Sequence, residues 1–146
     1  MSKLWQMLVL TVVLGAAAFI TGPKIWPMAP DVPTPPANLL PAYIVLAAVE
    51  ALAFGFAVAF AIFGWPMMRD LRLGAGWLNK LLFGTLIWFM GNWWFHDNLH
   101  MHIGLDMHRL VYIEYAFHLT MLACGVTLVV GLVRCARQAA TQTRPD

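Results

Sequence analysis

Four long apolar runs constrain the fold of this sequence more than any other feature. They cover about residues 4–22, 41–65, 77–100 and 109–133, and each is close to or above the roughly 20 residues that a helix needs to cross a membrane. The runs are continuous rather than alternating, which excludes the strands of a membrane barrel. With 61% hydrophobic and 11% charged residues, the chain has too few polar side chains to cover a soluble domain. We therefore predict an all-α integral membrane protein, a four-transmembrane-helix bundle forming one membrane domain over 1–146.

The basic residues are divided unequally between the two ends of these runs. In a four-span protein, seven of the nine lysines and arginines lie on one side, and only Lys24 and Arg109 lie on the other. Short loops rich in Lys and Arg stay on the cytoplasmic side. We therefore predict an N-in/C-in protein of a bacterial-type inner (plasma) membrane, with a short cytoplasmic tail at 134–146. A Pro-rich loop (23–40) and a His-rich loop (96–109) then face the periplasm.

The histidines and glutamates are confined to a small part of the chain. All five histidines lie between residues 96 and 118, and the only two glutamates, Glu50 and Glu114, both lie inside predicted spans. Glutamate is ordinarily a surface residue. An ionisable group inside a membrane is costly and commonly marks a functional site. These few residues are therefore the first candidates for function.

Helical spacing predicts that these groups meet at one level. His96 and His100 are four residues apart, as are Glu114 and His118, so each pair shares one face of its helix. A short loop between the third and fourth spans brings the outer ends of these two helices together. Glu50 lies at a similar depth, roughly 13 Å along its own helix at about 1.5 Å per residue. We expect all five side chains to converge in the outer half of the bundle.

Imidazole and carboxylate groups in this mixture are typical ligands of zinc or non-haem iron. We therefore predict a metal site formed by His96, His100, His118, Glu114 and Glu50. Copper is a second choice, because methionines near the histidines add soft donors. Haem b is the alternative cofactor, held by His118 together with His96 or His100. Four neighbours are candidates for orienting the ligand histidines: Asp97, His102, Asp106 and His108.

Several classes of membrane protein fit these features. The first is a small metal- or haem-binding subunit or accessory of a larger membrane redox assembly. The second is a membrane enzyme that uses buried Glu and His groups for acid–base or metal-assisted chemistry on a lipid-soluble substrate. A proton or ion path is a third, which the scarcity of polar residues in the inner half of the bundle disfavours, and a cofactor-free structural accessory subunit is a fourth. The expected partners are the lipid bilayer and other membrane subunits or further copies of the chain. Nucleic acid is not an expected partner, because a net charge of +2 excludes an extended nucleic-acid surface.

Overall fold

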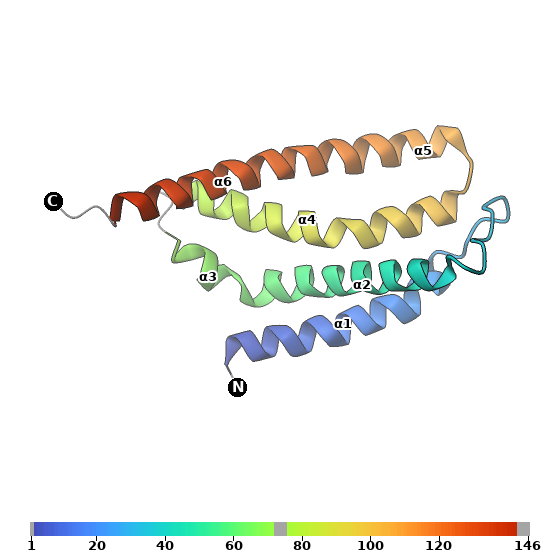
Figure 1. The fold of residues 1–146 in the computed structure, drawn as a ribbon, viewed down its shortest axis with the longest axis horizontal. Coiled ribbons are helices and arrows are strands. Elements are labelled where there is room, and N and C mark those ends of the chain that lie inside the picture. Colours follow the sequence, from blue (N-terminus) through green and yellow to red (C-terminus); the bar gives the residue numbers. More distant parts are fainter. Residues whose placement is uncertain (1, 72–75, 143–146) are drawn as a thin grey trace.

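The described part of the chain, residues 2–71 and 76–142 of a computed structural model, is helical apart from its connections and contains no strand. The last three helical elements follow one another without a break and form one long rod (Figure 1). The elements are α1 (Lys3–Ile25), α2 (Leu40–Phe63), α3 (Trp65–Arg69), α4 (Gly76–Ile103), α5 (Met107–Ile113), the π-helical segment η1 (Glu114–Leu119) and α6 (Thr120–Gln142).

The long helices lie side by side in chain order, as an open layer (Figure 1). α1 packs on α2, α2 on α4, and α4 on α5 and α6. Successive helices run in opposite directions, so the start of α1 and the end of α6 lie at one end of the layer (Figure 1). The turn 104–106 and the connection between α1 and α2 lie at the other end. The helices therefore follow the expected up-and-down course, and they form a row with two open edges.

Three helical stretches within the described ranges are long and apolar enough to cross a membrane: Lys3–Ile25, Leu40–Phe63 and Met107–Gln138. α4 has 28 residues, about 42 Å of helix, but its polar residues make it less apolar than these three. Two of these polar residues, Asn79 and Asn92, are buried. α4 lies between α2 and α6 in the row (Figure 1), and Asn79 Nδ2 donates to the carbonyl oxygens of Met68 and Leu71, each at 2.7 Å.

Small residues allow α1 and α2 to approach closely. Ala51, Gly55 and Ala59 are buried at four-residue spacing on α2, and small side chains on one face let helix backbones come together. A Cβ atom at Gly55 would overlap the carbonyl oxygen of Thr11 and lie 2.6 Å from the backbone nitrogen of Gly15. Because both atoms belong to the backbone of α1, neither can turn aside, and only glycine fits at this crossing.

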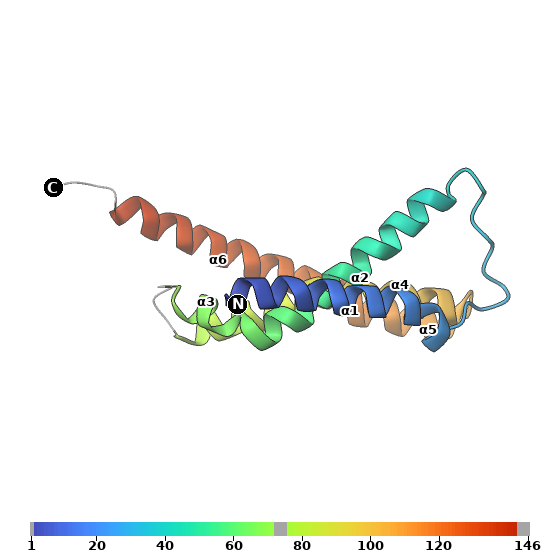
Figure 2. The ribbon, with the colours of Figure 1, turned by 90° about the horizontal axis from the view of Figure 1, so that it is seen from below.

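The proline-rich connection between α1 and α2 is held against the turn that follows α4. The backbone nitrogen of Ala29 donates to the carbonyl oxygen of Met101 at 2.9 Å, and that of Leu105 donates to Asp31 Oδ2 at 2.9 Å. Gly104 has a φ of +67°, where a side chain is strained, and a Cβ atom there would overlap Asp31 Oδ1. Figure 2 shows the N-terminal half of α2, which follows this connection, leaving the layer.

Three helices continue beyond their expected ends. α1 reaches Ile25 instead of 22, so the first residues of the expected Pro-rich loop at 23–40 are helical. α4 continues to Ile103, so residues 96–103 of the expected His-rich loop are helical and only a short turn remains. α4 ends at Ile103 because the next residue, Gly104, adopts a left-handed backbone, which glycine favours and a helix cannot contain. α6 continues to Gln142, beyond the expected end at 133, because the residues after 133 are good helix formers without glycine or proline up to that point.

Candidate metal site

A cavity of about 760 Å³ lies beside the N-terminal half of α2. That half of the helix leans away from the layer (Figure 2). The cavity wall combines residues from α2, α4 and η1 with residues of the proline-rich connection. The structure brings all five residues of the expected site to this wall: Glu50, His96, His100, Glu114 and His118.

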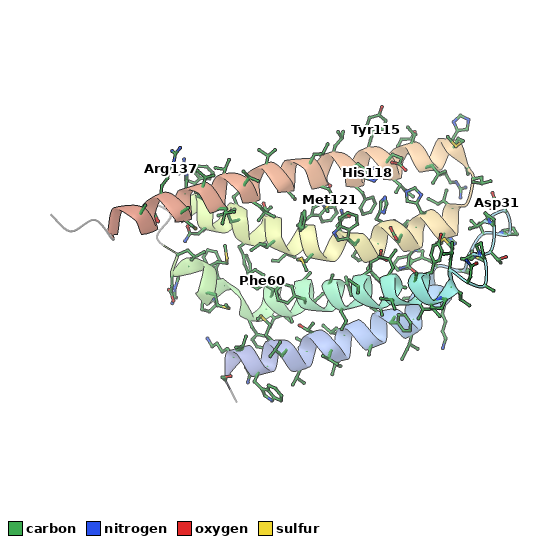
Figure 3. All side chains as sticks on the ribbon, in the orientation of Figure 1. Asp31, Phe60, Tyr115, His118, Met121 and Arg137 are labelled. Carbon is green, nitrogen blue, oxygen red and sulfur yellow. The ribbon has the colours of Figure 1, made fainter. Side chains whose placement is uncertain are left out.

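Three imidazole rings form the centre of this cluster. The ring centroid of His96 lies 4.5 Å from that of His100 and 4.9 Å from that of His118, and both pairs meet edge to face. His96 and His100 are neighbours on α4, as their four-residue spacing predicts. His118 points from η1 towards α4, whereas Tyr115, three residues earlier, points away from the layer (Figure 3). Two helices therefore supply the three rings.

Glu114 joins two of these rings. Its Oε1 lies 3.2 Å from Nε2 of His100, and its Oε2 lies 2.5 Å from Nδ1 of His118. One carboxylate thus holds imidazoles from two different helices in defined orientations. The side chains of Glu114 and His118 remain about half exposed, at 48% and 52%. This side of the cluster is therefore open at the surface of the chain.

Asp97 orients the third ring. Its Oδ1 lies 2.7 Å from Nδ1 of His96, which donates the hydrogen bond to this carboxylate oxygen, and in the neutral ring the lone pair is then on Nε2. Nε2 is buried and has no hydrogen-bond partner. The Asp97 carboxyl also lies within hydrogen-bonding reach of the buried Glu50 carboxyl. A histidine with a carboxylate on one ring nitrogen and a free second nitrogen has the arrangement of a metal ligand.

The π-helical segment that carries Glu114 and His118 was not predicted from the sequence. Such segments are rare and frequently occur at functional sites. Its position against α4 is set by Trp88, whose Nε1 donates to Thr120 Oγ1 at 2.8 Å and whose ring stacks on Phe117. No residue pattern in this stretch distinguishes it from an ordinary α-helix, so the π-helical geometry could not be predicted from the sequence periodicity.

The four candidates for orienting groups have different positions. Asp97 lines the cavity, and it lies on α4 rather than in a loop. His102 Nδ1 donates to the carbonyl oxygen of Pro27 at 2.9 Å and so helps to hold the proline-rich connection. Asp106 caps α5 by accepting a hydrogen bond from the backbone nitrogen of His108. These last three residues are not among those that line the cavity.

Asn92, which lies four residues before His96 on α4, was not among the predicted site residues. It is 1% exposed, and its Oδ1 has no hydrogen-bond partner. One sequence feature could have indicated this residue. An amide side chain lies inside a predicted span, on the helix face that also carries His96.

The donor set suits a metal ion, although its members do not converge on one point. Within residues 2–71 and 76–142, no group of three His, Cys, Asp or Glu side chains is positioned to hold a metal ion. The reason is that His100 and His118 direct ring nitrogens at Glu114. Imidazole with carboxylate nevertheless matches zinc or non-haem iron. Haem fits less well, because the ring of His96 packs directly on those of His100 and His118.

The chain matches no protein-family model, no curated protein and no solved structure. Its fold defines a helical protein with three helical stretches that are long and apolar enough to cross a membrane. Its distinctive feature is a cluster of three histidines and neighbouring carboxyl groups at one end of an open helical layer.

Proposed function

We propose that this protein binds a transition-metal ion, zinc or non-haem iron, through His96, His100 and His118. The observation that carries the proposal is the buried Nε2 of His96, which has no partner while Asp97 orients its ring. Leaving such an atom unpaired costs about 1–3 kcal/mol, and a metal ion is the partner that the surrounding donors favour.

A bound ion accounts for the acidic residues of the cluster. His100 and His118 would each keep one ring nitrogen hydrogen-bonded to Glu114 and offer the lone pair of the other ring nitrogen to the ion. Its positive charge would offset the repulsion among the carboxylates of Glu114, Asp97 and Glu50. Both glutamates of the chain, Glu50 and Glu114, would then lie beside the bound cation.

We further propose that the protein is a subunit or accessory of a larger membrane redox assembly. Glu114 and His118 are half exposed on a helical stretch apolar enough to span a membrane. Ionisable groups at such a position face protein or a water-filled cavity rather than lipid. Another membrane subunit or a second copy covering this side would satisfy that requirement.

An alternative function is a membrane enzyme that acts on a lipid-soluble substrate. The observation that favours it is a second cavity of about 420 Å³ between α2 and α4. Its wall is apolar and includes Phe54, Trp88 and Phe95, the last of which precedes His96 in the chain. A hydrocarbon chain in this cavity would leave its polar end close to the histidine cluster.

The first prediction concerns cofactor content. Protein purified in detergent should contain about one equivalent of zinc or iron per chain by elemental analysis, and its absorption spectrum should lack a Soret band. Chelator-treated protein should take up one equivalent again, which separates a specific site from loosely bound metal. A Soret band would assign haem instead. Protein with neither metal nor haem would identify the cluster as a structural hydrogen-bond network and favour the cofactor-free accessory subunit.

We also propose that the protein has four spans in a bacterial-type inner membrane: the three apolar stretches named above and, in addition, α4. Both termini are then cytoplasmic, and the histidine cluster lies near the periplasm. The support is the positive-inside rule applied to the observed layer. Basic residues at the end of the layer that holds the termini are Lys3, Arg69, Lys80, Arg134 and Arg137, against Lys24 and Arg109 at the other end.

The second prediction tests this topology with single cysteines. In a background with Cys124 and Cys135 replaced by alanine, Met107→Cys on intact cells should react with a membrane-impermeant maleimide. Asp70→Cys should react only after the cells are broken. Met107 is 74% exposed and the Asp70 side chain 72% exposed, so both sites are accessible once the reagent reaches them. The reverse labelling pattern would put the histidine cluster on the cytoplasmic side.

A further inference from the structure

Two cavities follow each other along the contact between α2 and α4. The apolar cavity, of about 420 Å³, is lined by residues of these two helices, and the cluster cavity, of about 760 Å³, is lined by the histidine cluster. Residues of α2 at three- and four-residue spacing line first one cavity and then the other: Ala61, Ala57, Phe54, Glu50, Ala47 and Tyr43. Such spacing places them on one face of the helix, so the two cavities belong to one groove.

α4 forms the other side of this groove in the same way. Its residues at three- and four-residue spacing line the apolar cavity and then the cluster cavity: Gly84, Trp88, Gly91, Phe95 and Asn98. The ring centroid of Phe95 lies 5.3 Å from that of Phe54, in the wall of the apolar cavity, and 5.9 Å from that of Trp26, in the wall of the cluster cavity. One ring therefore contacts the walls of both cavities, which are direct neighbours.

The apolar cavity suits a hydrocarbon. The only side-chain N–H among the described residues that line it belongs to Trp88, and this group already donates to Thr120 Oγ1 at 2.8 Å. A polar group placed here would lose its hydrogen bonds to water without gaining others. Space is open beside Gly84, because a Cβ atom there would have nothing within 4 Å.

The charge of the cluster cavity limits what it can hold. Its wall includes three carboxyl side chains, Glu50, Asp97 and Glu114, and among the described residues that line it there is no lysine or arginine. Carboxylates repel an anion, and the repulsion is stronger away from water. The anionic head of a phospholipid or a fatty acid is therefore a poor occupant, whereas an uncharged polar head meets no such repulsion.

Asn98 offers an acceptor to an uncharged head. Its Nδ2 donates to the carbonyl oxygen of Trp94 at 2.7 Å, which fixes the amide and leaves Oδ1 to accept. An amide oxygen needs a donor, such as a hydroxyl group. The wall also contains Trp26, Tyr43 and Met101, on which a flat ring packs better than a compact ammonium group does.

We infer that this groove binds a lipid-soluble molecule of the phenol or quinol class. Its hydroxylated ring lies in the cluster cavity and donates a hydrogen bond to Asn98 Oδ1, and its hydrocarbon tail lies in the apolar cavity. Both volumes are typical of small-molecule sites, which span about 300–1,000 Å³. The inference rests on the alternative function proposed above, whose substrate class it names, and it needs no bound metal.

The test measures equilibrium binding of radiolabelled para-decylphenol to the full-length protein in lipid nanodiscs, with empty nanodiscs as background. The protein is first treated with a chelator, so that metal content does not affect the result. We expect saturable binding of about one molecule per chain. The methyl ether para-decylanisole has the same ring and tail but no O–H, so it should bind about tenfold more weakly, the effect of one hydrogen bond.

Two variants test the two ends of the groove. Asn98→Leu should weaken para-decylphenol about tenfold and leave para-decylanisole unchanged, because the ether makes no hydrogen bond to lose. Gly84→Leu fills the apolar cavity and should weaken both molecules about tenfold, but not tail-free para-methylphenol. If Asn98→Leu does not fold, Asn98→Ala removes the same acceptor.

Gly125→Leu is the matched control for Gly84→Leu. Gly125 lies on α6, outside both cavity walls, and a Cβ atom there would also have nothing within 4 Å. This variant should bind para-decylphenol as the wild type does. An equal loss in Gly125→Leu would overturn the assignment of the tail to the apolar cavity.

The remaining outcomes separate this inference from the proposed functions. Wild-type affinity for para-decylphenol in both Asn98→Leu and Gly84→Leu would overturn the groove as the binding site. Tighter binding of decylammonium or decanoate than of para-decylphenol would overturn the uncharged hydroxylated head. Absence of saturable binding would overturn the inference and leave the metal site standing. Saturable binding of a quinol that the protein leaves chemically unchanged would support the inference and contradict the enzyme.

Discussion

Replacing His118 by alanine is expected to remove the metal ion from the purified protein. His118 is the histidine that η1 contributes, and its ring lies 4.9 Å from that of His96 on the neighbouring helix. Loss of a supporting residue around a metal typically lowers its affinity roughly 10–100-fold, and loss of a ligand should exceed that range. Elemental analysis and Co(II) titration would measure the change. The helical circular dichroism should stay the same, because membrane insertion depends on the apolar helices.

His102→Ala is the matched control for this result. His102 lies on α4 two residues after His100, but its ring bonds to the carbonyl oxygen of Pro27 outside the cavity wall. The variant should keep its metal. Full metal content in His118→Ala would remove His118 from the site. Equal loss in both variants would show that the metal responds to general destabilisation of this end of the layer.

Gly55→Ala is expected to produce the largest loss of stability. The added Cβ meets the carbonyl oxygen of Thr11 and the backbone nitrogen of Gly15, so α1 must move away from α2. Overpacking usually costs about 1–3 kcal/mol, and a clash with backbone belongs to the upper part of that range. Thermal unfolding in detergent should show a Tm lowered by roughly 6 °C or more.

Gly84→Ala tests the same substitution without the contact. Gly84 lies within α4, and a Cβ atom there would have nothing within 4 Å. Alanine favours a helix over glycine by about 1 kcal/mol, so this variant should be as stable as the wild type or slightly more stable. If Gly55→Ala and Gly84→Ala have the same Tm, the close approach of α1 and α2 does not contribute to stability.

The open layer and the site depend on each other. The N-terminal half of α2 leaves the layer (Figure 2), and the cavity is lined by residues of this half, of α4 and of η1. The connection that precedes α2 is tied to the turn after α4 through Asp31 and Leu105. A hydrogen bond of the surface connection thus joins the segment before α2 to the turn after α4, the two helices that contribute most of the cavity wall.

The positions of the helices and the meeting of the five side chains follow from the sequence alone. Continuous apolar runs predict helices because a helix satisfies its own backbone without water. The spacing of His96 and His100 is a local property of one helix, so it survives any change in packing. The short turn at 104–106 then requires the ends of α4 and α5 to be neighbours, which brings Glu114 and His118 to the same level.

Only the tertiary structure decided the order of the layer and the partners within the site. Periodicity tells which residues share a face, but it does not tell which neighbour covers that face. The bonds of Glu114 to two histidines and of Asp97 to His96 join atoms whose distances depend on the packing of α4 against η1. The same holds for the unpaired oxygen of Asn92, because a buried polar atom is satisfied or orphaned by its three-dimensional surroundings and not by its own sequence.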